Sequence, residues 1–211
     1  MQAAEFREAL TEIRRGHELG SRRSNWPYPS ASWLSRAERM VALEGSLPAV
    51  LRGELKPKDA REGIEFAELT YQTQRYSSSA RLYAEAFQAD PKLAADMNDQ
   101  NRYNAVCSAA LVGAGKGDGA VPVDPSAKPV WRKQAIDWLR ADLVFWTKQS
   151  HAAKPEVKDL VSERLRHWKE DSDLGIIRNE SAVKALPENE QIACRALWAD
   201  VEALLKKVES R

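Results

Sequence analysis

The segment 67–91 constrains the fold most, because its residue spacing predicts two helices joined by a short turn. Ala67 and Ala86 are small residues at points where two helix backbones would approach each other closely. Phe66 and Tyr83 would fill the space between those helices. Pro91 closes the segment, since proline cannot continue a helix. The pattern therefore predicts a helical hairpin within an all-α chain.

This hairpin resembles the tetratricopeptide repeat (TPR), a unit of about 34 residues made of two antiparallel helices. The residues that carry the repeat register are Phe66, Ala67, Tyr76, Tyr83, Ala86 and Pro91. Three positions depart from the repeat pattern, where Gly63 replaces a large aromatic residue, Thr70 a tyrosine and Ser79 an alanine. The resemblance implies an all-α fold, a TPR-like right-handed superhelix of antiparallel helix pairs with a C-terminal capping helix.

Two further stretches extend the pattern. A divergent copy is predicted from a helix at 103–110 and a second helix at 135–139, separated by an insertion at 113–129. Glycine and proline are so frequent in this insertion that we expect a surface loop with a mobile tip. Residues 1–20 resemble a second repeat helix whose first helix is missing, so we expect either a longer array or pairing with another chain.

The predicted organisation is a partial TPR at 1–20, linker and capping helices at 21–58, a TPR unit at 59–93, a divergent unit at 94–150 with the inserted loop 113–129, and C-terminal capping helices at 151–211. Within these units, a helix is expected from near Ser32, interrupted at 45–48 by glycine, serine and proline. Asp59 is a predicted helix cap. Pro155 is expected to open one later helix, and the final helix follows Pro187.

Nearly the whole chain also resembles the C-terminal helical region that follows TPR arrays in large planctomycete-type bacterial proteins, many of which carry a serine/threonine kinase domain upstream. The stretches that carry this resemblance are 14–23, 25–39, 47–54, 80–94, 102–111 and 196–207. It implies that the chain is part of a larger multidomain protein. The chain itself lacks the Gly-rich loop, His-Arg-Asp and Asp-Phe-Gly motifs of a kinase.

Charge and composition narrow the class of partner. The chain has 32 Lys and Arg against 31 Asp and Glu, and these charges are interspersed, so we expect neither nucleic acid nor a membrane as a partner. No signal sequence or long apolar run is present, and we expect a cytoplasmic protein. Cys107 and Cys194 lie in apolar helical patterns that predict buried free thiols. We expect no metal and no cofactor.

Several features that suggest chemistry have simpler explanations. The sequence at 113–117 resembles a phosphate loop but lacks the Ser or Thr that follows its lysine. His17, His151 and His167 are too far apart in sequence for metal-ligand spacing. Four tryptophans are expected in the core, namely Trp138, Trp146, Trp168 and Trp198. Trp26 and Trp33 stay open, either as a clamp on the linker or as a small exposed site.

The first helix of each repeat lines the concave face of a TPR array, which makes that face the predicted binding site. The candidate peptide-binding residues are Arg61, Ile64, Glu68, Tyr71, Asn101, Asn104, Ser108 and Leu111. They predict a non-catalytic scaffold that binds a peptide or protein segment, as a monomer or as a weak homodimer through the N-terminal helix edge. Two alternatives remain. One is a structural cap on a longer array, or a regulatory region of a kinase-containing protein; the other is an enzyme with a pocket near Trp26, Trp33 and the 113–129 loop.

Overall fold

The computed structural model describes residues 2–96, 99–151 and 154–210. Within this part of the chain all regular elements are helices, which confirms the all-α class. The elements are α1 (Gln2–Gly20), α2 (Ser30–Leu51), α3 (Ala60–Gln72), α4 (Tyr76–Ala89), α5 (Pro91–Ala95), α6 (Asn101–Gly113), α7 (Ala127–Ser150), α8 (Pro155–Glu170), the 3-10 helix η1 (Ser172–Leu174), α9 (Gly175–Arg178), α10 (Glu180–Lys184) and α11 (Glu188–Glu209). The predicted units 1–20, 94–150 and 151–211 each include residues outside this description, which are 1, 97, 98, 152, 153 and 211.

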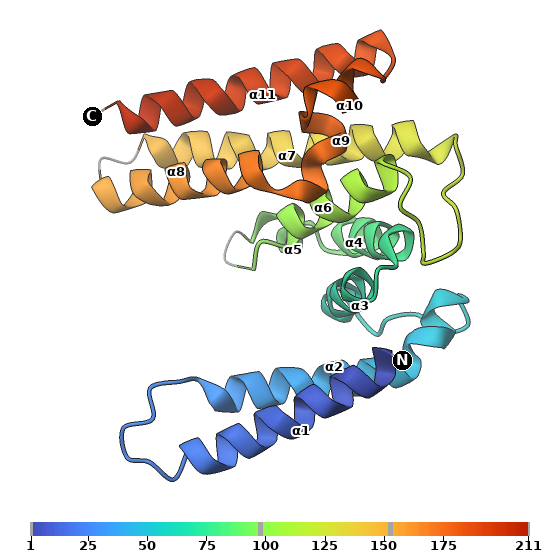
Figure 1. The fold of residues 1–211 in the computed structure, drawn as a ribbon, viewed down its shortest axis with the longest axis vertical. Helices are drawn as coiled ribbons and strands as arrows, with labels where there is room; N and C mark the ends of the chain where they lie inside the picture. The colour runs from blue at the N-terminus through green and yellow to red at the C-terminus, as the bar shows by residue number, and fades with distance from the viewer. Residues whose placement is uncertain (1, 97–98, 152–153, 211) are drawn as a thin grey trace.

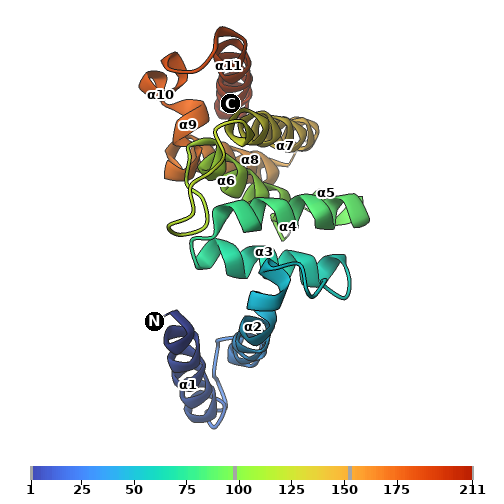
Figure 2. The same cartoon turned by 90° about the vertical axis from the view of Figure 1, so that its right-hand side faces the viewer.

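The helices stack in layers along the long axis of the molecule (Figure 1). The α1–α2 hairpin forms one end, the α3–α4 hairpin follows, and α6 lies between α4 and α7 (Figure 2). At the other end, α8 and α11 pack on each other and on α7. None of the helices in the described residues has an apolar stretch long enough to cross a bilayer.

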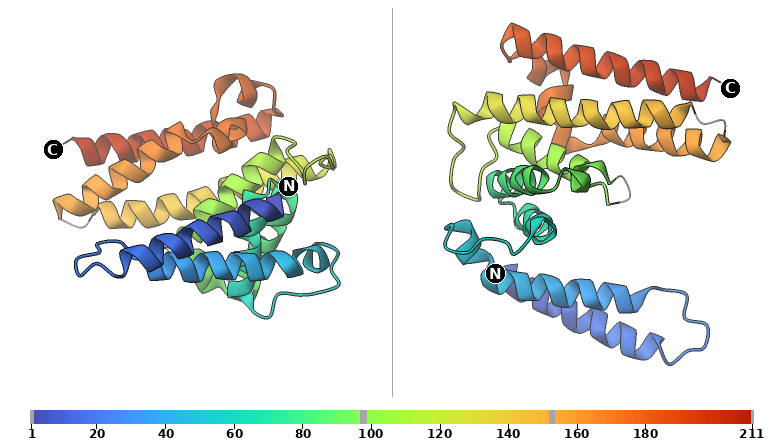
Figure 3. Two further views of the ribbon diagram at one scale, coloured as in Figure 1. Left: turned by 60° about the horizontal axis from the view of Figure 1, so that its bottom comes forward. Right: turned by 180° about the vertical axis from the view of Figure 1, so that it is seen from behind.

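The first helix has a neighbour, which corrects the expectation that its partner is missing. α2 follows α1 and packs against it as an antiparallel hairpin (Figure 3). Phe6, Leu10 and Ile13 of α1 are partly covered, and the Nδ1 atom of His17 lies 2.8 Å from the Ser30 hydroxyl oxygen. His17 is therefore a hydrogen-bonded structural residue, and the partner helix of 1–20 lies after it in the chain.

The second helix is continuous, so the predicted interruption at 45–48 is wrong. Pro48 lies inside α2 on its exposed face, with the buried residues Leu47 and Val50 beside it. The Pro48 carbonyl still accepts a hydrogen bond from the Arg52 N–H at 3.2 Å. Burial of the adjacent apolar residues thus holds the last turn in helical form despite the missing N–H of proline.

The α3–α4 hairpin was predicted from sequence, and its departures from the repeat pattern have local causes. Asp59 caps α3, where its carboxylate accepts a hydrogen bond from the Glu62 N–H at 2.9 Å. A Cβ atom placed on Gly63 would lie 3.3 Å from the Ala86 Cβ atom, so the glycine lets the two helices approach closely. Ser79 is buried and donates a hydrogen bond to the Ala67 carbonyl at 2.8 Å.

The second predicted pair is formed by α6 and α7, and the insertion between them is a loop at 114–126. The loop is anchored to the start of α4, because Asp118 accepts hydrogen bonds from the Ser78 N–H at 3.0 Å and the Ser78 hydroxyl at 2.5 Å. Val123 of the loop is buried. The predicted surface loop is thus confirmed, while the mobility of its tip stays a prediction.

The C-terminal helices begin where the prolines predicted, at Pro155 and after Pro187. Gly175 starts the short helix α9. Ile192, near the start of α11, is 61% exposed although most apolar residues of this helix are buried.

Two large apolar cores run through the described residues, and a small third cluster joins Ala80 and Val112 to Val123 of the inserted loop. The larger lies among α6, α7, α8 and α11 and contains Trp146 and Trp168. The smaller lies among α2, α3, α4 and the start of α6. Trp138 packs against both, which joins them. Cys107 and Cys194 are free and buried, as predicted.

Candidate functional site

A groove with a volume of about 740 Å³ runs between α2, α3 and the start of α6. Its floor is apolar and consists of Met40, Ile64 and Leu93, which are all less than 10% exposed. Its walls are polar, and α2 contributes a row of polar side chains that includes Ser35. A groove with an apolar floor and polar walls suits a polypeptide segment, because side chains pack on the floor while backbone groups find hydrogen-bonding partners on the walls.

Five of the eight predicted site residues line this groove, namely Arg61, Ile64, Glu68, Asn101 and Asn104. The first three come from α3 and the two asparagines from the first turn of α6. Sequence reasoning placed both sets on the first helices of successive units, and the fold brings them to one cavity.

The other three predicted residues do not line the groove. Ser108 and Leu111 are buried inside α6, and the Ser108 hydroxyl oxygen lies 2.9 Å from that of Ser79. The reason is that α6 is enclosed by α4 and α7, so only its first turn reaches the groove. Tyr71 lies at the other end of α3, where its hydroxyl donates a hydrogen bond to Asp173.

Ion pairs cross the groove between α2 and α3. The Arg39 guanidinium lies 2.7 Å from a Glu62 carboxylate oxygen and 2.6 Å from one of Glu65. The Arg36 guanidinium lies 3.1 Å from a Glu68 carboxylate oxygen. The hydrogen bonds that Arg39 donates to both glutamates raise its pKa, so it stays charged. These contacts add to the apolar packing between α2 and α3, to which Met40 and Ile64 belong.

Glu68 is the most perturbed acid of the groove. Its side chain is 23% exposed, and burial raises the pKa of its carboxyl group although Arg36 acts in the opposite direction. The negative charges of Glu65 and Asp99 raise that pKa further. The Glu68 carboxyl group thus lies near two other negative charges, and both disfavour its ionisation.

Sequence reasoning missed the α2 wall of the groove. Ser32, Ser35, Arg36 and Arg39 recur at intervals of three or four residues and share one face of α2. This spacing was visible in the sequence. The assignment of 21–58 to a linker and capping helices does not predict a binding surface on this stretch.

A second polar cluster lies where α3 and α6 meet the link between α8 and α9. The Tyr103 hydroxyl donates to Asp171 at 2.7 Å, and the Cys107 thiol lies 3.6 Å from the same carboxylate oxygen. Tyr71 donates to Asp173 across 102 residues of sequence. The cluster connects the N-terminal and C-terminal halves of the chain by hydrogen bonds, and no sequence spacing predicted it.

The same cluster contains a set of atoms of the kind that bind metals. Cys107 Sγ and one carboxylate oxygen each from Asp171 and Asp173 lie within 4.8 Å of one another. Burial, with the nearby aspartates, raises the pKa of the Cys107 thiol well above its usual value. The protonated thiol and the two tyrosine hydroxyls act as hydrogen-bond donors to the carboxylates, so the arrangement serves as a buried polar network.

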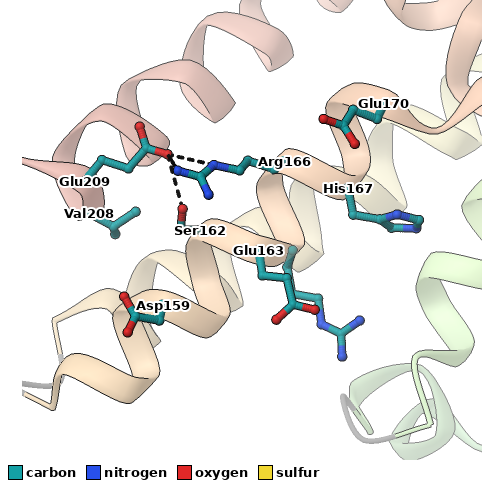
Figure 4. A pocket seen from close by; sticks show the side chains of 9 residues that line it. Asp159, Ser162, Glu163, Arg166, His167, Glu170, Val208 and Glu209 are labelled. Atoms are coloured by element: carbon teal, nitrogen blue, oxygen red, sulfur yellow. Dashed lines mark hydrogen bonds and ion pairs between the residues drawn. The ribbon is translucent and has the colours of Figure 1, made fainter.

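Two other regions bear on the earlier alternatives. A polar cavity of about 820 Å³ lies on α8 and α11, where Arg166 and Ser162 point toward Glu209 and donate hydrogen bonds to it (Figure 4). None of the predicted site residues lines it. The turn between α1 and α2, which contains Trp26 and leads into the first turn of α2 with Trp33, lies on the opposite side of the molecule from the 114–126 loop (Figures 1 and 3). The fold therefore does not bring together the segments that the enzyme alternative placed around one pocket.

Trp26 and Trp33 are joined through Tyr28 in an aromatic cluster. The ring centroids of Trp26 and Tyr28 lie 5.0 Å apart, and those of Tyr28 and Trp33 lie 6.0 Å apart. Trp26 also covers Gly20, where a Cβ atom would overlap its ring. Trp26 thus packs on the end of α1, whereas Trp33 is 48% exposed, and a binding site at this pair stays a prediction.

Comparison with known proteins adds no family assignment, since no family model, curated protein or solved structure matches the chain.

Proposed function

We propose that this chain is a non-catalytic interaction domain of TPR-like architecture, whose groove between α2, α3 and α6 binds a peptide or protein segment. The observation that carries the proposal is the meeting of Arg61, Ile64, Glu68, Asn101 and Asn104 in one cavity. The repeat register alone predicts these five residues as binding residues. Stacking of the α3–α4 hairpin against α6 and α7 supports the TPR-like arrangement.

The groove offers what a bound segment needs. Its floor of Met40, Ile64 and Leu93 accepts apolar side chains, and the Asn104 amide and Ser35 hydroxyl can bond with a peptide backbone. We expect a dissociation constant in the micromolar range, or about −8 kcal/mol, because the site is small and open. We also propose that the chain is located in the cytoplasm and that it forms part of a larger protein.

Selection of peptides tests the proposal. A random library of displayed 12-residue peptides is panned against the full chain, and the affinity of selected peptides is measured by isothermal titration calorimetry. Ser35→Trp places a bulky ring in the groove from an exposed position of α2, so we expect at least about a tenfold loss of affinity. Ala42→Trp is the matched control, because Ala42 is exposed on the same helix but does not line the groove.

Two results decide the outcome. Loss of binding with Ser35→Trp and retention with Ala42→Trp supports the groove as the binding site. Equal affinity for both variants and the unchanged protein shows that the peptides bind elsewhere, and the proposal then fails. Circular dichroism on both variants confirms that each is folded before affinities are compared.

A structural cap on a repeat array is the second candidate, favoured by the last layer of the fold. Leu197, Val201 and Leu205 of α11 are buried toward the core, whereas Arg195, Lys206 and other charged residues face outward. A polar outer face of this kind ends a stack of repeats. If capping is the function, removing α11 will make the chain aggregate, as light scattering would show, and peptide selection will yield no groove-dependent binder.

A further inference from the structure

We propose that Cys107, Asp171 and Asp173 form a binding site for a divalent transition-metal ion such as Zn²⁺. The Cys107 thiolate and one oxygen of each carboxylate are the protein ligands. The site lies apart from the groove between α2, α3 and α6, so it goes beyond the proposed function and does not depend on it. Two observations carry it, the separations of the ligand atoms and the charge that collects where α6 meets the link between α8 and α9.

The ligand atoms lie at separations that a single ion can bridge. Cys107 Sγ and one oxygen each from Asp171 and Asp173 lie within 4.8 Å of one another. The Sγ atom lies 3.6 Å from Oδ2 of Asp171. A sulfur and an oxygen bound to one tetrahedral zinc ion lie about 3.5 Å apart, given bonds of about 2.3 Å and about 2.0–2.1 Å. The thiol and the Asp171 carboxylate thus already have the separation of two zinc ligands.

The backbone places the three residues on separate elements. Cys107 lies within α6, Asp171 directly follows α8, and Asp173 lies in η1. The Asp171 carboxylate accepts a hydrogen bond from the Asp173 N–H at 2.9 Å, which fixes the chain between the two acids. Cys107 is 5% exposed and the Asp171 side chain 15% exposed. The sulfur is therefore buried behind carboxylates that reach the solvent, and an ion can enter from their side.

Little positive charge of the protein balances the two carboxylates. Among the described residues, His167 is the only basic side chain paired with either, with Nε2 at 3.7 Å from Oδ2 of Asp171, and it is 55% exposed. Arg178 is close in the fold, but its guanidinium donates to the backbone carbonyls of Trp168 and Asp171. A divalent cation would balance the charge of both carboxylates at this partly buried point.

The ligand atoms also select the kind of ion. A thiolate is a soft ligand, so it disfavours Mg²⁺ and Ca²⁺ and favours Zn²⁺ or Co²⁺, which accept sulfur and oxygen together. Binding replaces the proton of the Cys107 thiol, which passes to solvent. Tyr71 and Tyr103 continue to donate to the carboxylates, and hydrogen bonds of this kind orient metal ligands. Water takes the fourth position, and the ion ties α6 to the link between α8 and α9.

Cobalt binding to the full chain tests the site. A thiolate bound to Co²⁺ gives a charge-transfer absorption in the near ultraviolet that oxygen ligands do not give. We expect this absorption to saturate with one Co²⁺ per chain and to disappear when Zn²⁺ is added. Cys107→Ser should abolish it. Cys194→Ser is the matched control and should retain it, because Cys194 is the other buried free thiol and lies outside this set of ligand atoms.

A second variant keeps the thiol. Asp173→Asn removes one anionic ligand, so we expect its affinity for Zn²⁺, measured by competition with Co²⁺, to fall at least about tenfold. Asp137→Asn is the control, because Asp137 is half exposed on α7 and pairs with Lys133. Zn²⁺ should also raise the melting temperature of the unchanged protein more than that of Asp173→Asn, since an ion that binds the folded chain stabilises it. Circular dichroism shows that each variant is folded.

The outcomes are decisive for the metal site alone. Absence of the thiolate absorption with Co²⁺, or its persistence in Cys107→Ser, overturns the proposal. Equal Zn²⁺ affinity of Asp173→Asn and Asp137→Asn overturns it as well, because the ion would then bind without the aspartate. Loss confined to Cys107→Ser and Asp173→Asn supports it. Peptide binding and its response to Ser35→Trp concern the groove, so the two proposals can fail separately.

Discussion

The junction between α2 and α3 and the packing of α6, α7, α8 and α11 both join helices through an apolar core, but ion pairs contribute more of the contact at the first. At the first junction, exposed arginines of α2 pair with glutamates of α3. In the second region, apolar side chains such as Trp168, which is 2% exposed, fill the space between helices, and polar groups are enclosed with partners. The comparison teaches that the candidate groove lies where helix contacts are sparse and ion pairs supplement the apolar core, because close apolar packing throughout would leave no space for a ligand.

The largest expected effect lies in the C-terminal core. Trp168 stacks on Tyr103 with ring centroids 6.0 Å apart and is almost fully buried. Trp168→Ala should lower the free energy of unfolding by about 3–5 kcal/mol, because it removes apolar contact and leaves a cavity. Urea denaturation measures the change. A loss below about 1 kcal/mol would mean that this core can collapse around the void, and the contrast between the regions would weaken.

The next effect depends on pH and concerns a buried ion pair. Asp142 is 1% exposed and accepts a hydrogen bond from Arg102 at 2.5 Å, yet burial raises its pKa from 3.8 to about 6. Between these values the folded chain holds a proton that the unfolded chain has released. The contribution of this group to stability therefore falls as pH rises from about 4 to 6, by roughly 2–3 kcal/mol.

Asp142→Asn isolates this contribution, since it removes the titrating group from the same position. Denaturation curves measured at pH 4 and pH 6 should show a smaller difference for the variant than for the unchanged protein. The same pH dependence in both proteins would show that other groups determine it.

A smaller effect is expected at the polar cluster that joins the two halves. Tyr71→Phe removes the hydroxyl that donates to Asp173 and leaves a partly buried carboxylate with one donor fewer. The free energy of unfolding should fall by about 1–3 kcal/mol. Tyr28→Phe is the control, because Tyr28 is 55% exposed and its change should have little effect. Equal losses in the two variants would contradict a linking role for the cluster.

The smallest effect belongs to the α2–α3 junction. Arg36→Ala removes one ion pair with Glu68 whose arginine is 67% exposed, so the loss of stability should stay below about 1 kcal/mol and shrink further in 1 M salt. Thermal denaturation at low and high salt measures it. A loss of several kcal/mol that persists in salt would show that this junction is as tightly joined as the core.

The sequence predicted those elements whose stability is local. The α3–α4 hairpin, the α6–α7 pair and the helices beginning at Pro155 and after Pro187 all follow from apolar periodicity and helix breakers. The continuity of α2 through Pro48 could not be predicted in this way, because neighbouring buried residues stabilise it. Sequence patterns predict well where a helix starts, but they do not predict that tertiary packing will stabilise a helix across a proline.

For the candidate site, the repeat register correctly grouped five residues of α3 and α6 that line one groove, but it gave no information on which predicted residues are buried. Ser108 and Leu111 were misplaced because enclosure of α6 depends on where α4 and α7 pack. The contact between Tyr71 and Asp173, 102 residues apart, is likewise a product of tertiary structure. Spacing along one helix identifies a face, and only the assembled fold shows what covers that face.

The anchor of the inserted loop has a consequence for folding. The residue that precedes α4, Arg75, makes no side-chain capping bond, and Asp118 from the following unit supplies a carboxylate to the Ser78 N–H instead. In a simple array each unit contributes its own stability together with that of its contacts to neighbours. Here the start of α4 is completed only when the next pair is in place. We therefore expect the two units to unfold in one transition, and a fragment that ends near residue 93 to unfold less cooperatively than the whole chain.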